Sequence, residues 1–178
     1  MVRVDQLMTS PVVTCSTRDN LNTVAALMWD HDCGVVPVVD EAGRLAGILT
    51  DRDICMAAYT QGRRLHEIPV DTVMTREVYS CRPDDPITRA EESMEAHQVR
   101  RVPVVDADGH PVGVLSLNDL ARASSRASAS QRGLLTGFAR TLAAICRPRS
   151  AVREASHVPY GWEDYLQRSP RAQSPPGK

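Results

Sequence analysis

The chain has 178 residues and a net charge of −1, and its 42% hydrophobic and 24% charged residues are ordinary for a globular protein that buries one core. No apolar run approaches the roughly 18 residues that span a bilayer, and the start MVRVDQLMTSPVV lacks the features of a signal peptide, so we expect a cytoplasmic protein. The five cysteines have neither CxxC nor Cys/His ligand spacing, so we expect no metal site and no disulfide framework.

The first predicted elements are a short strand near residues 12–15 and an amphipathic helix that Asp19 opens. The helix is predicted because apolar residues recur at the spacing i, i+3, i+4 and i+7, which places them on one face. These residues are Leu21, Val24, Ala25 and Met28.

Two β-rich runs follow at residues 34–40 and 44–50, and a closing helix is predicted after Thr50. The linker between the runs contains Gly43, which suits a hairpin turn because glycine tolerates positive φ. The predicted order is β-α-β-β-α.

The whole pattern recurs 66 residues later without a gap, because residues 5–54 and 71–120 share 17 identities in 50 aligned positions. We therefore expect a mixed α/β fold built from two pseudo-symmetric units. The elements of the second unit are a strand near residues 78–81, a helix opened by Asp85 with Pro86 at its first position, strands at residues 101–106 and 110–116, and a helix after Ser116.

Each unit contains a hydroxyl and a carboxylate where its last strand becomes a helix. Thr50 and Asp53 occupy this junction in the first unit, and Ser116 and Asp119 occupy it in the second. In one interpretation the pair is a capping box that satisfies free backbone amides. In the other, the helix start attracts a phosphate and the carboxylate accepts hydrogen bonds from a ribose. The two roles are compatible.

The VPVV strands, the glycine-bearing turns and the GILTxxD and GVLSxxD junctions together resemble a tandem pair of CBS domains, the Bateman module. The resemblance covers about residues 3–124 and extends to small stand-alone actinobacterial proteins of the hypoxic-response type. It implies one repeat at residues 3–60, a second at residues 69–124, and a separate tail at residues 125–178. It also implies a non-enzymatic regulatory module that binds AMP, ADP, ATP or another adenosyl compound and requires no cofactor.

The resemblance implies a ligand site in clefts between the repeats. Thr50 and Ser116 would lie by the phosphates, and Asp53 and Asp119 would bind the ribose. Apolar groups in the patches at residues 34–37 and 100–103, Val36 and Val102 among them, would sandwich the adenine. Segments 13–15 and 79–81 would form the facing walls.

Three arginines are candidates for phosphate contacts because a guanidinium matches phosphate oxygens well. Arg100 and Arg101 replace a glycine and a valine of the first repeat, and Arg52 follows the first junction. Because of the arginine pair, we expect the cleft with Ser116 and Asp119 to be the principal site. The alternative is that these arginines simply face water or an acidic neighbour.

Several other residues recur at the 66-residue offset. His31 and His97 come late in equivalent helices, where a structural role is expected. Cys15 and Cys81 are expected to be packing groups, with a redox or ligand-wall role left open. No nucleophile, base and orienting residue are grouped in a motif, so we expect no catalytic residues.

The tail differs from the repeats in composition and charge. Residues 1–120 carry 11 arginines and 19 acidic residues, a net charge of −8, whereas residues 121–178 carry 10 basic and 3 acidic residues, a net charge of +7. A linker-like run of alanine, serine and arginine begins the tail, and its end at residues 169–178 is expected to be disordered, whereas Trp162 and Tyr165 are candidates for docking. After the linker-like run and before Trp162, an amphipathic helix is predicted. Its apolar face would be formed by Leu134, Leu135, Phe138, Leu142 and Ile145.

Opposite charge favours docking of this helix on the acidic core, of its own chain or of a second copy. An unidentified protein partner is the next alternative, followed by membrane or nucleic acid, and no motif for specific DNA recognition is present. The prediction for the whole chain is a homodimeric sensor that changes the shape it offers to a regulated protein. The competing interpretation is a constitutive interaction module with vestigial clefts that acts through its basic tail.

Overall fold

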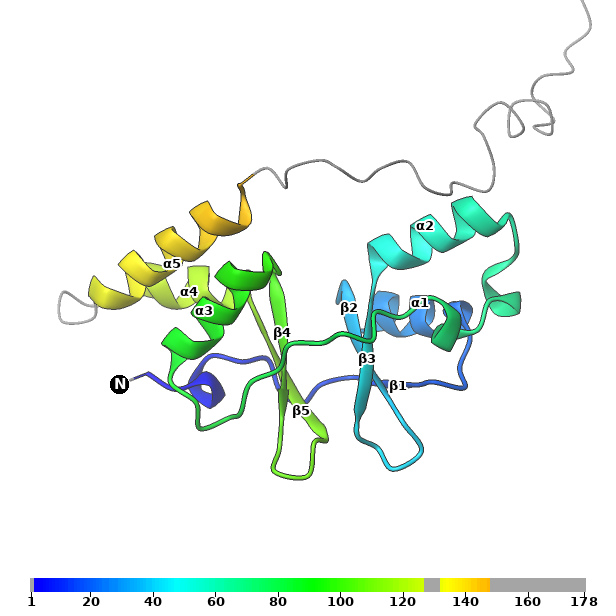
Figure 1. The fold of residues 1–178 in the computed structure, drawn as a ribbon, viewed down its shortest axis with the longest axis horizontal. Coiled ribbons are helices and arrows are strands. Elements are labelled where there is room, and N and C mark those ends of the chain that lie inside the picture. The colour runs from blue at the N-terminus through cyan, green and yellow to red at the C-terminus, as the bar shows by residue number, and fades with distance from the viewer. Residues whose placement is uncertain (1, 127–131, 148–178) are drawn as a thin grey trace, which may run out of the picture.

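The computed structural model describes residues 2–126 and 132–147, which form two lobes side by side (Figure 1). The predictions for the linker and for residues 148–178, including Trp162 and Tyr165, lie outside the described residues. No helix in the described ranges is both long and apolar enough to cross a membrane. The elements of the first lobe are β1 (Cys15–Ser16), α1 (Leu21–Asp30), β2 (Val35–Val39), β3 (Leu45–Thr50), α2 (Asp51–Gln61) and the short 3-10 helices η2 (Leu65–Glu67) and η3 (Val70–Thr72).

The second lobe repeats the helices α1 and α2, the hairpin and, at the 66-residue offset, the 3-10 helix η3, and it adds a fifth α-helix, so the predicted mixed α/β duplication is confirmed. Each lobe has its own cluster of buried apolar side chains. The elements of the second lobe are η1 (Val4–Gln6), α3 (Ile87–His97), β4 (Arg101–Val105), β5 (Pro111–Ser116), α4 (Leu117–Arg126) and α5 (Arg132–Ile145).

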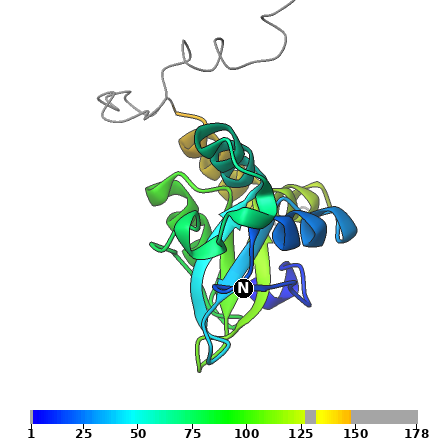
Figure 2. The ribbon, with the colours of Figure 1, turned by 90° about the vertical axis from the view of Figure 1, so that its right-hand side faces the viewer.

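Each lobe contains an antiparallel hairpin, β2–β3 or β4–β5, with the same register in both. Figure 2 shows that both hairpins extend beyond the helices on the same side. Their turns are in contact, since the backbone N–H of Leu45 donates to the carbonyl of Gly109 over 2.9 Å. The predicted turn glycines, Gly43 and Gly109, have φ of 76° and 88°, which is a conformation that favours glycine.

Three boundaries differ from the predictions, the first of them because a local hydrogen bond selects another residue. Asn20 caps α1 by accepting from the N–H of Thr23, whereas Asp19 accepts from Ser16 instead. Pro86 lies at the N-cap of α3 rather than at its first helical position. The strand predicted at residues 78–81 is reduced to one parallel bridge between Cys81 and Val104.

The segment that precedes each repeat pairs with the lobe of the other repeat. Thr9 exchanges two backbone hydrogen bonds with Val114 of β5, and Thr75 exchanges two with Ile48 of β3. The neighbouring Met8 packs in the second lobe and Met74 in the first. Each lobe is therefore completed by residues from the other copy.

Two equivalent glycines make this exchange sterically feasible. A Cβ atom at Gly47 would lie 2.8 Å from Sδ of Met74, and one at Gly113 would lie 2.6 Å from Sδ of Met8. In both cases the carbonyl oxygen of the next threonine lies 3.0 Å away. Any side chain at these strand positions would push the exchanged segment off the sheet.

The helix of the tail, α5, packs against α3 and α4 of the second lobe (Figure 1). Its buried face consists of Gly137, Thr141, Ala144 and Ile145, and Ile145 joins the core of that lobe. The predicted apolar face is therefore wrong for Leu142, which is 37% exposed, and partly right for Phe138, which is half-buried. The side chains of Leu134 and Leu135 lie outside the described part.

Candidate functional site

The first junction is a capping box in which Thr50 and Asp53 bind each other. The side chain of Thr50 accepts from the backbone N–H of Asp53 over 3.3 Å and donates its hydroxyl to Oδ2 of Asp53 over 2.7 Å. The backbone N–H of Thr50 donates to the same Oδ2 over 2.9 Å. The local interpretation of the motif is confirmed here, because the helix α2 starts with its end amides satisfied in this way.

One oxygen of the Asp53 carboxylate is not used by this box. No donor among the described residues forms a hydrogen bond with Oδ1, and Asp53 is half-buried rather than buried. An acceptor of this kind at the mouth of a helix is able to bind a hydroxyl of a ligand.

The second junction has the same box but a different environment. The backbone N–H and the hydroxyl of Ser116 donate to Oδ2 of Asp119 over 2.8 and 2.5 Å. Its Oδ1 accepts from the guanidinium of Arg122 and from the hydroxyl of Thr9, the latter over 3.5 Å. Asp119 is only 4% exposed. Both of its oxygens already have protein partners.

The two partners of Oδ1 were missed in the analysis of the sequence. Arg122 follows Asp119 at the spacing i, i+3, a distance at which helical ion pairs form, so this pair was recognisable. Thr9 comes from the exchanged segment, 110 residues earlier in the chain. No local pattern points to that contact.

Arg101 lies against the first lobe although it belongs to the second. A Cβ atom built at Gly34 would lie 3.3 Å from Nη2 of Arg101 and 2.9 Å from Oδ2 of Asp51. Gly34 in turn contacts the start of α2, since its carbonyl accepts from the N–H of Asp51 over 3.4 Å. A guanidinium from one repeat therefore stands beside the junction of the other.

The other two predicted arginines are exposed. Arg52 is in the first turn of α2 and Arg100 immediately precedes β4. Within residues 2–126 and 132–147, no ion pair involves Arg52, Arg100 or Arg101. The three cations are thus available to an anion.

The prediction that Val36 and Val102 contact a ligand needs correction. Both side chains are completely buried, and each packs in the apolar core of its lobe. The strands are enclosed on both faces near these positions, so the side chains cannot reach a ligand between the lobes without opening the core.

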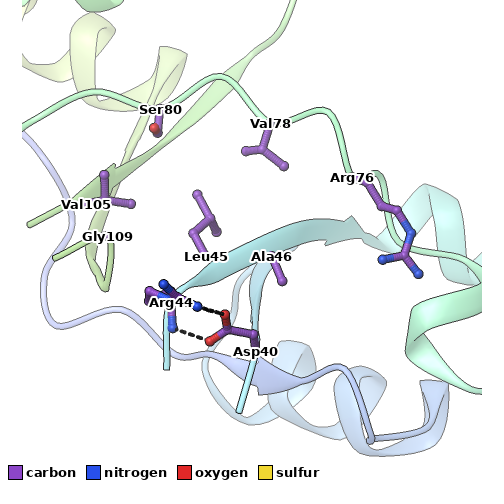
Figure 3. Close-up of a pocket in the computed structure, with 9 residues that line it drawn as sticks. All are labelled: Asp40, Arg44, Leu45, Ala46, Arg76, Val78, Ser80, Val105 and Gly109. Carbon is purple, nitrogen blue, oxygen red and sulfur yellow. Dashed lines mark hydrogen bonds and ion pairs between the residues drawn. The ribbon is translucent and has the colours of Figure 1, made fainter. Parts of the chain in front are cut away.

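A separate pocket of about 440 Å³ lies between the lobes near the hairpin turns (Figure 3). The guanidinium of Arg44 is held at its edge by Asp40, and Leu45, Val78 and Val105 supply apolar surface. None of the nine predicted site residues lines this pocket. Ser80, from the predicted wall at residues 79–81, does line it.

The recurring cysteines are packing groups in the structure. Burial and the nearby Asp19 carboxylate raise the pKa of Cys15 to about 12. Burial and the nearby Asp85 carboxylate raise the pKa of Cys81 likewise to about 12. Both thiols stay protonated at neutral pH, which argues against a redox role.

One cluster of metal-ligand types lies in the second hairpin turn, where Asp106, Asp108 and His110 bring their side-chain atoms within 4.8 Å of one another. Asp106 accepts there from the N–H groups of Asp108 and His110. Asp40 makes the same bonds in the first turn, to Ala42 and Arg44, which offer no metal ligand. The turn conformation therefore accounts for the cluster.

Comparisons with known proteins agree with the duplicated architecture. A sequence profile described as the CBS domain matches residues 4–59 and 70–126. The CBS domain-containing protein YhcV of Bacillus subtilis is 40% identical over 121 residues, which are 68% of this chain and 84% of that protein.

Three solved structures are similar over the same region. Hypoxic Response Protein I with two coordinated zinc ions has a TM-score of 0.61 and 30% identity, covering 68% of this chain and 98% of its own. The CBS domain pair of protein MJ0100, in complex with 5'-methylthioadenosine and S-adenosyl-L-methionine, has a TM-score of 0.64 and 26% identity, covering 70% and 97%. The CBS domain protein PAE2072 from Pyrobaculum aerophilum, complexed with AMP, has a TM-score of 0.65 and 26% identity, covering 76% and 99%.

Proposed function

The chain belongs to the CBS domain family as a tandem pair, and from this we propose that it is a regulatory module that binds an adenine nucleotide or another adenosyl compound between its repeats. Two CBS pairs of similar structure hold such ligands, AMP in one and 5'-methylthioadenosine with S-adenosyl-L-methionine in the other. We propose no catalytic activity for it.

The observation that carries this proposal is the first junction together with Arg101. Oδ1 of Asp53 is an acceptor without a hydrogen-bond partner in the described chain, which suits a ribose hydroxyl. Arg101, beside Gly34, supplies a cation that suits a phosphate. We therefore place the ligand at the first junction, with Thr50 at the helix mouth and Arg52 and Arg100 as further cations. The second junction, with Ser116 and Asp119, is the secondary candidate.

Thermal unfolding of the full chain with AMP, ADP, ATP, 5'-methylthioadenosine and S-adenosyl-L-methionine tests the proposal. A ligand at about 100 times its Kd adds roughly 2.7 kcal/mol to the free energy of unfolding, which is readily seen as a higher Tm. If none of these compounds raises the Tm, the chain is not such a sensor. A constitutive interaction module that acts through the basic tail would then take its place.

Matched variants locate the ligand. Asp53→Asn should reduce binding at least tenfold, because a charged acceptor is replaced by a neutral amide, whereas Asp119→Asn should keep it. Arg101→Ala should weaken AMP and ATP more than 5'-methylthioadenosine, which has no phosphate. Loss of binding in Asp119→Asn with full binding in Asp53→Asn would move the ligand to the second junction.

We also propose that the chain is a cytoplasmic homodimer that regulates a protein not identified by its own sequence. The helices α1 and α2 expose three large apolar side chains, Trp29 (87%), Met56 (47%) and Tyr59 (52%). A second copy that presents the same face would cover them in a two-fold contact. Light scattering of the full chain should give twice the monomer mass.

A further inference from the structure

The contact between α5 and the second lobe is built over a buried carboxylate. Glu91 of α3 is only 2% exposed, and its Oε1 is buried without a hydrogen-bond partner among residues 2–126 and 132–147. Gly137 of α5 lies directly above it, since a Cβ atom there would be 2.6 Å from both carboxylate oxygens. An ionised carboxylate enclosed in this way would lack the solvation or hydrogen bonds that it needs.

Polar contacts around this carboxylate fix α5 in place. Glu95, one turn further along α3, accepts from Nε of Arg140 and from the hydroxyl of Thr141, each over 2.9 Å. Gln98 at the end of α3 donates to the carbonyls of Ala144 and Arg147 over 3.2 Å. These contacts require α5 to keep one register, with Gly137 over Glu91.

The charged groups around Glu91 do not neutralise it. On α5, the charged side chain that the structure describes is Arg140, and it already pairs with Glu95. On α3 itself, the neighbours Glu92 and Glu95 are both acidic. On α4, Asp119 and Arg122 pair with each other, and Arg126 is exposed. Glu91 therefore has no ion-pair partner among the described residues.

From this arrangement we propose that α5 is a pH-controlled cover of the α3–α4 face, which stays docked while Glu91 carries a proton and leaves when Glu91 ionises. The occupant of this face is the chain's own tail helix. The inference does not depend on ligand binding.

The expected direction follows from the pKa values. Burial, opposed in part by Arg140, raises the pKa of Glu91 from 4.5 to about 7. If undocked Glu91 titrates near its ordinary value, docking weakens as pH rises between these two values, in total by roughly 300-fold. For Glu95, burial raises the pKa, but the bonds from Arg140 and Thr141 outweigh burial and lower it. That contribution is lost as pH falls, so docking is tightest in mild acid.

Hydrogen exchange of the full chain between about pH 5.5 and 8.5, with rates corrected for intrinsic exchange, tests the proposal. Protection of the α5 amides should fall by roughly 30-fold across this range, levelling off above about pH 7, while the amides of β4 in the same lobe serve as the internal reference. In Glu91→Gln the α5 protection should not depend on pH. Glu92→Gln, with an exposed neighbour changed, should follow the wild type.

A second variant, Glu91→Ala, tests the same prediction in case Glu91→Gln does not fold. Glu91→Ala places at this position the residue that its equivalent, Ala25, has in the first repeat, and it should also abolish the pH dependence. Unchanged protection of the β4 amides, which lie in the same lobe as Glu91, shows that either variant is folded. The proposal is overturned if wild-type α5 protection is constant with pH, or if the drop persists in both Glu91 variants.

Discussion

The two repeats share a backbone but present opposite surfaces. Trp29 on α1 is replaced by Glu95 on α3 at the equivalent position, and Met56 on α2 by Arg122 on α4. The apolar side chains of the first repeat are exposed, whereas in the second repeat α5 packs against α3 and α4, where Glu95 pairs with Arg140 and Arg122 stays exposed. The junctions also differ, because within the described part of the chain one oxygen of Asp53 has no hydrogen-bond partner, whereas both oxygens of Asp119 have one. An identical motif in a duplicated chain thus has different access to partners in its two copies.

The largest effect on the free energy of unfolding is expected at two equivalent strand glycines, where the two repeats should behave alike. Gly47→Val and Gly113→Val would each place a side chain where Met74 or Met8 and a threonine carbonyl already lie. We expect each to lower the free energy of unfolding by about 3 kcal/mol, the upper range for overpacking. Urea unfolding measures this. A loss in one variant without a loss in the other would break the equivalence of the two exchanged segments.

The next largest effect on stability is expected in α5, the helix that packs on the second repeat. Ile145→Ala should destabilise the chain by about 2 kcal/mol, because the side chain is buried in the core of the second lobe. Its matched control is Leu142→Ala on the exposed side of α5, with an expected change below about 0.5 kcal/mol. Thermal unfolding at pH 6 compares them. Equal effects would contradict the docked register of α5.

The two junctions should also differ in stability. Asp119→Ala removes the bonds from Ser116, Thr9 and Arg122, so we expect a loss of about 2 kcal/mol. Asp53→Ala removes the capping box alone and should cost about 1 kcal/mol. Chemical denaturation without ligand separates the two values. If Asp53→Ala loses more stability than Asp119→Ala, the first junction contributes more to stability than the second, contrary to this prediction.

The smallest effect on stability is expected at Trp29, although its effect on assembly should be clear. Trp29→Glu copies the second repeat onto the first and should change the free energy of unfolding by less than about 0.5 kcal/mol, because the side chain is mostly exposed. In light scattering the variant should have the monomer mass where the wild type has twice that mass. A wild-type dimer that persists in the variant would place the interface elsewhere.

Local patterns in the sequence were sufficient for the order of the helices and hairpins, the hairpin glycines and the capping boxes, but not for the strand expected at residues 78–81. Each of these depends on residues within a few positions of one another, such as Thr50 and Asp53. The burial of Val36 and Val102 was not predictable in this way, because a strand enclosed on both faces lacks the alternation that distinguishes inside from outside. The contact of Thr9 with Asp119 and the packing of α5 depend on distant segments, for which periodicity gives no information.

The crossed pairing of the segments before each repeat has a consequence during synthesis. Residues 2–9 leave the ribosome before either lobe is complete, yet their partner strand at Val114 emerges 105 residues after Thr9, roughly 5–20 seconds later at typical elongation rates. The first lobe can fold as soon as Thr75 has been synthesised. At that point the apolar side chains of Val4, Leu7 and Met8 have no packing partners yet, because these belong to the second lobe. Residues 2–9 therefore belong to the lobe that folds last. A fusion or tag placed there will disturb the distant repeat rather than the adjacent one.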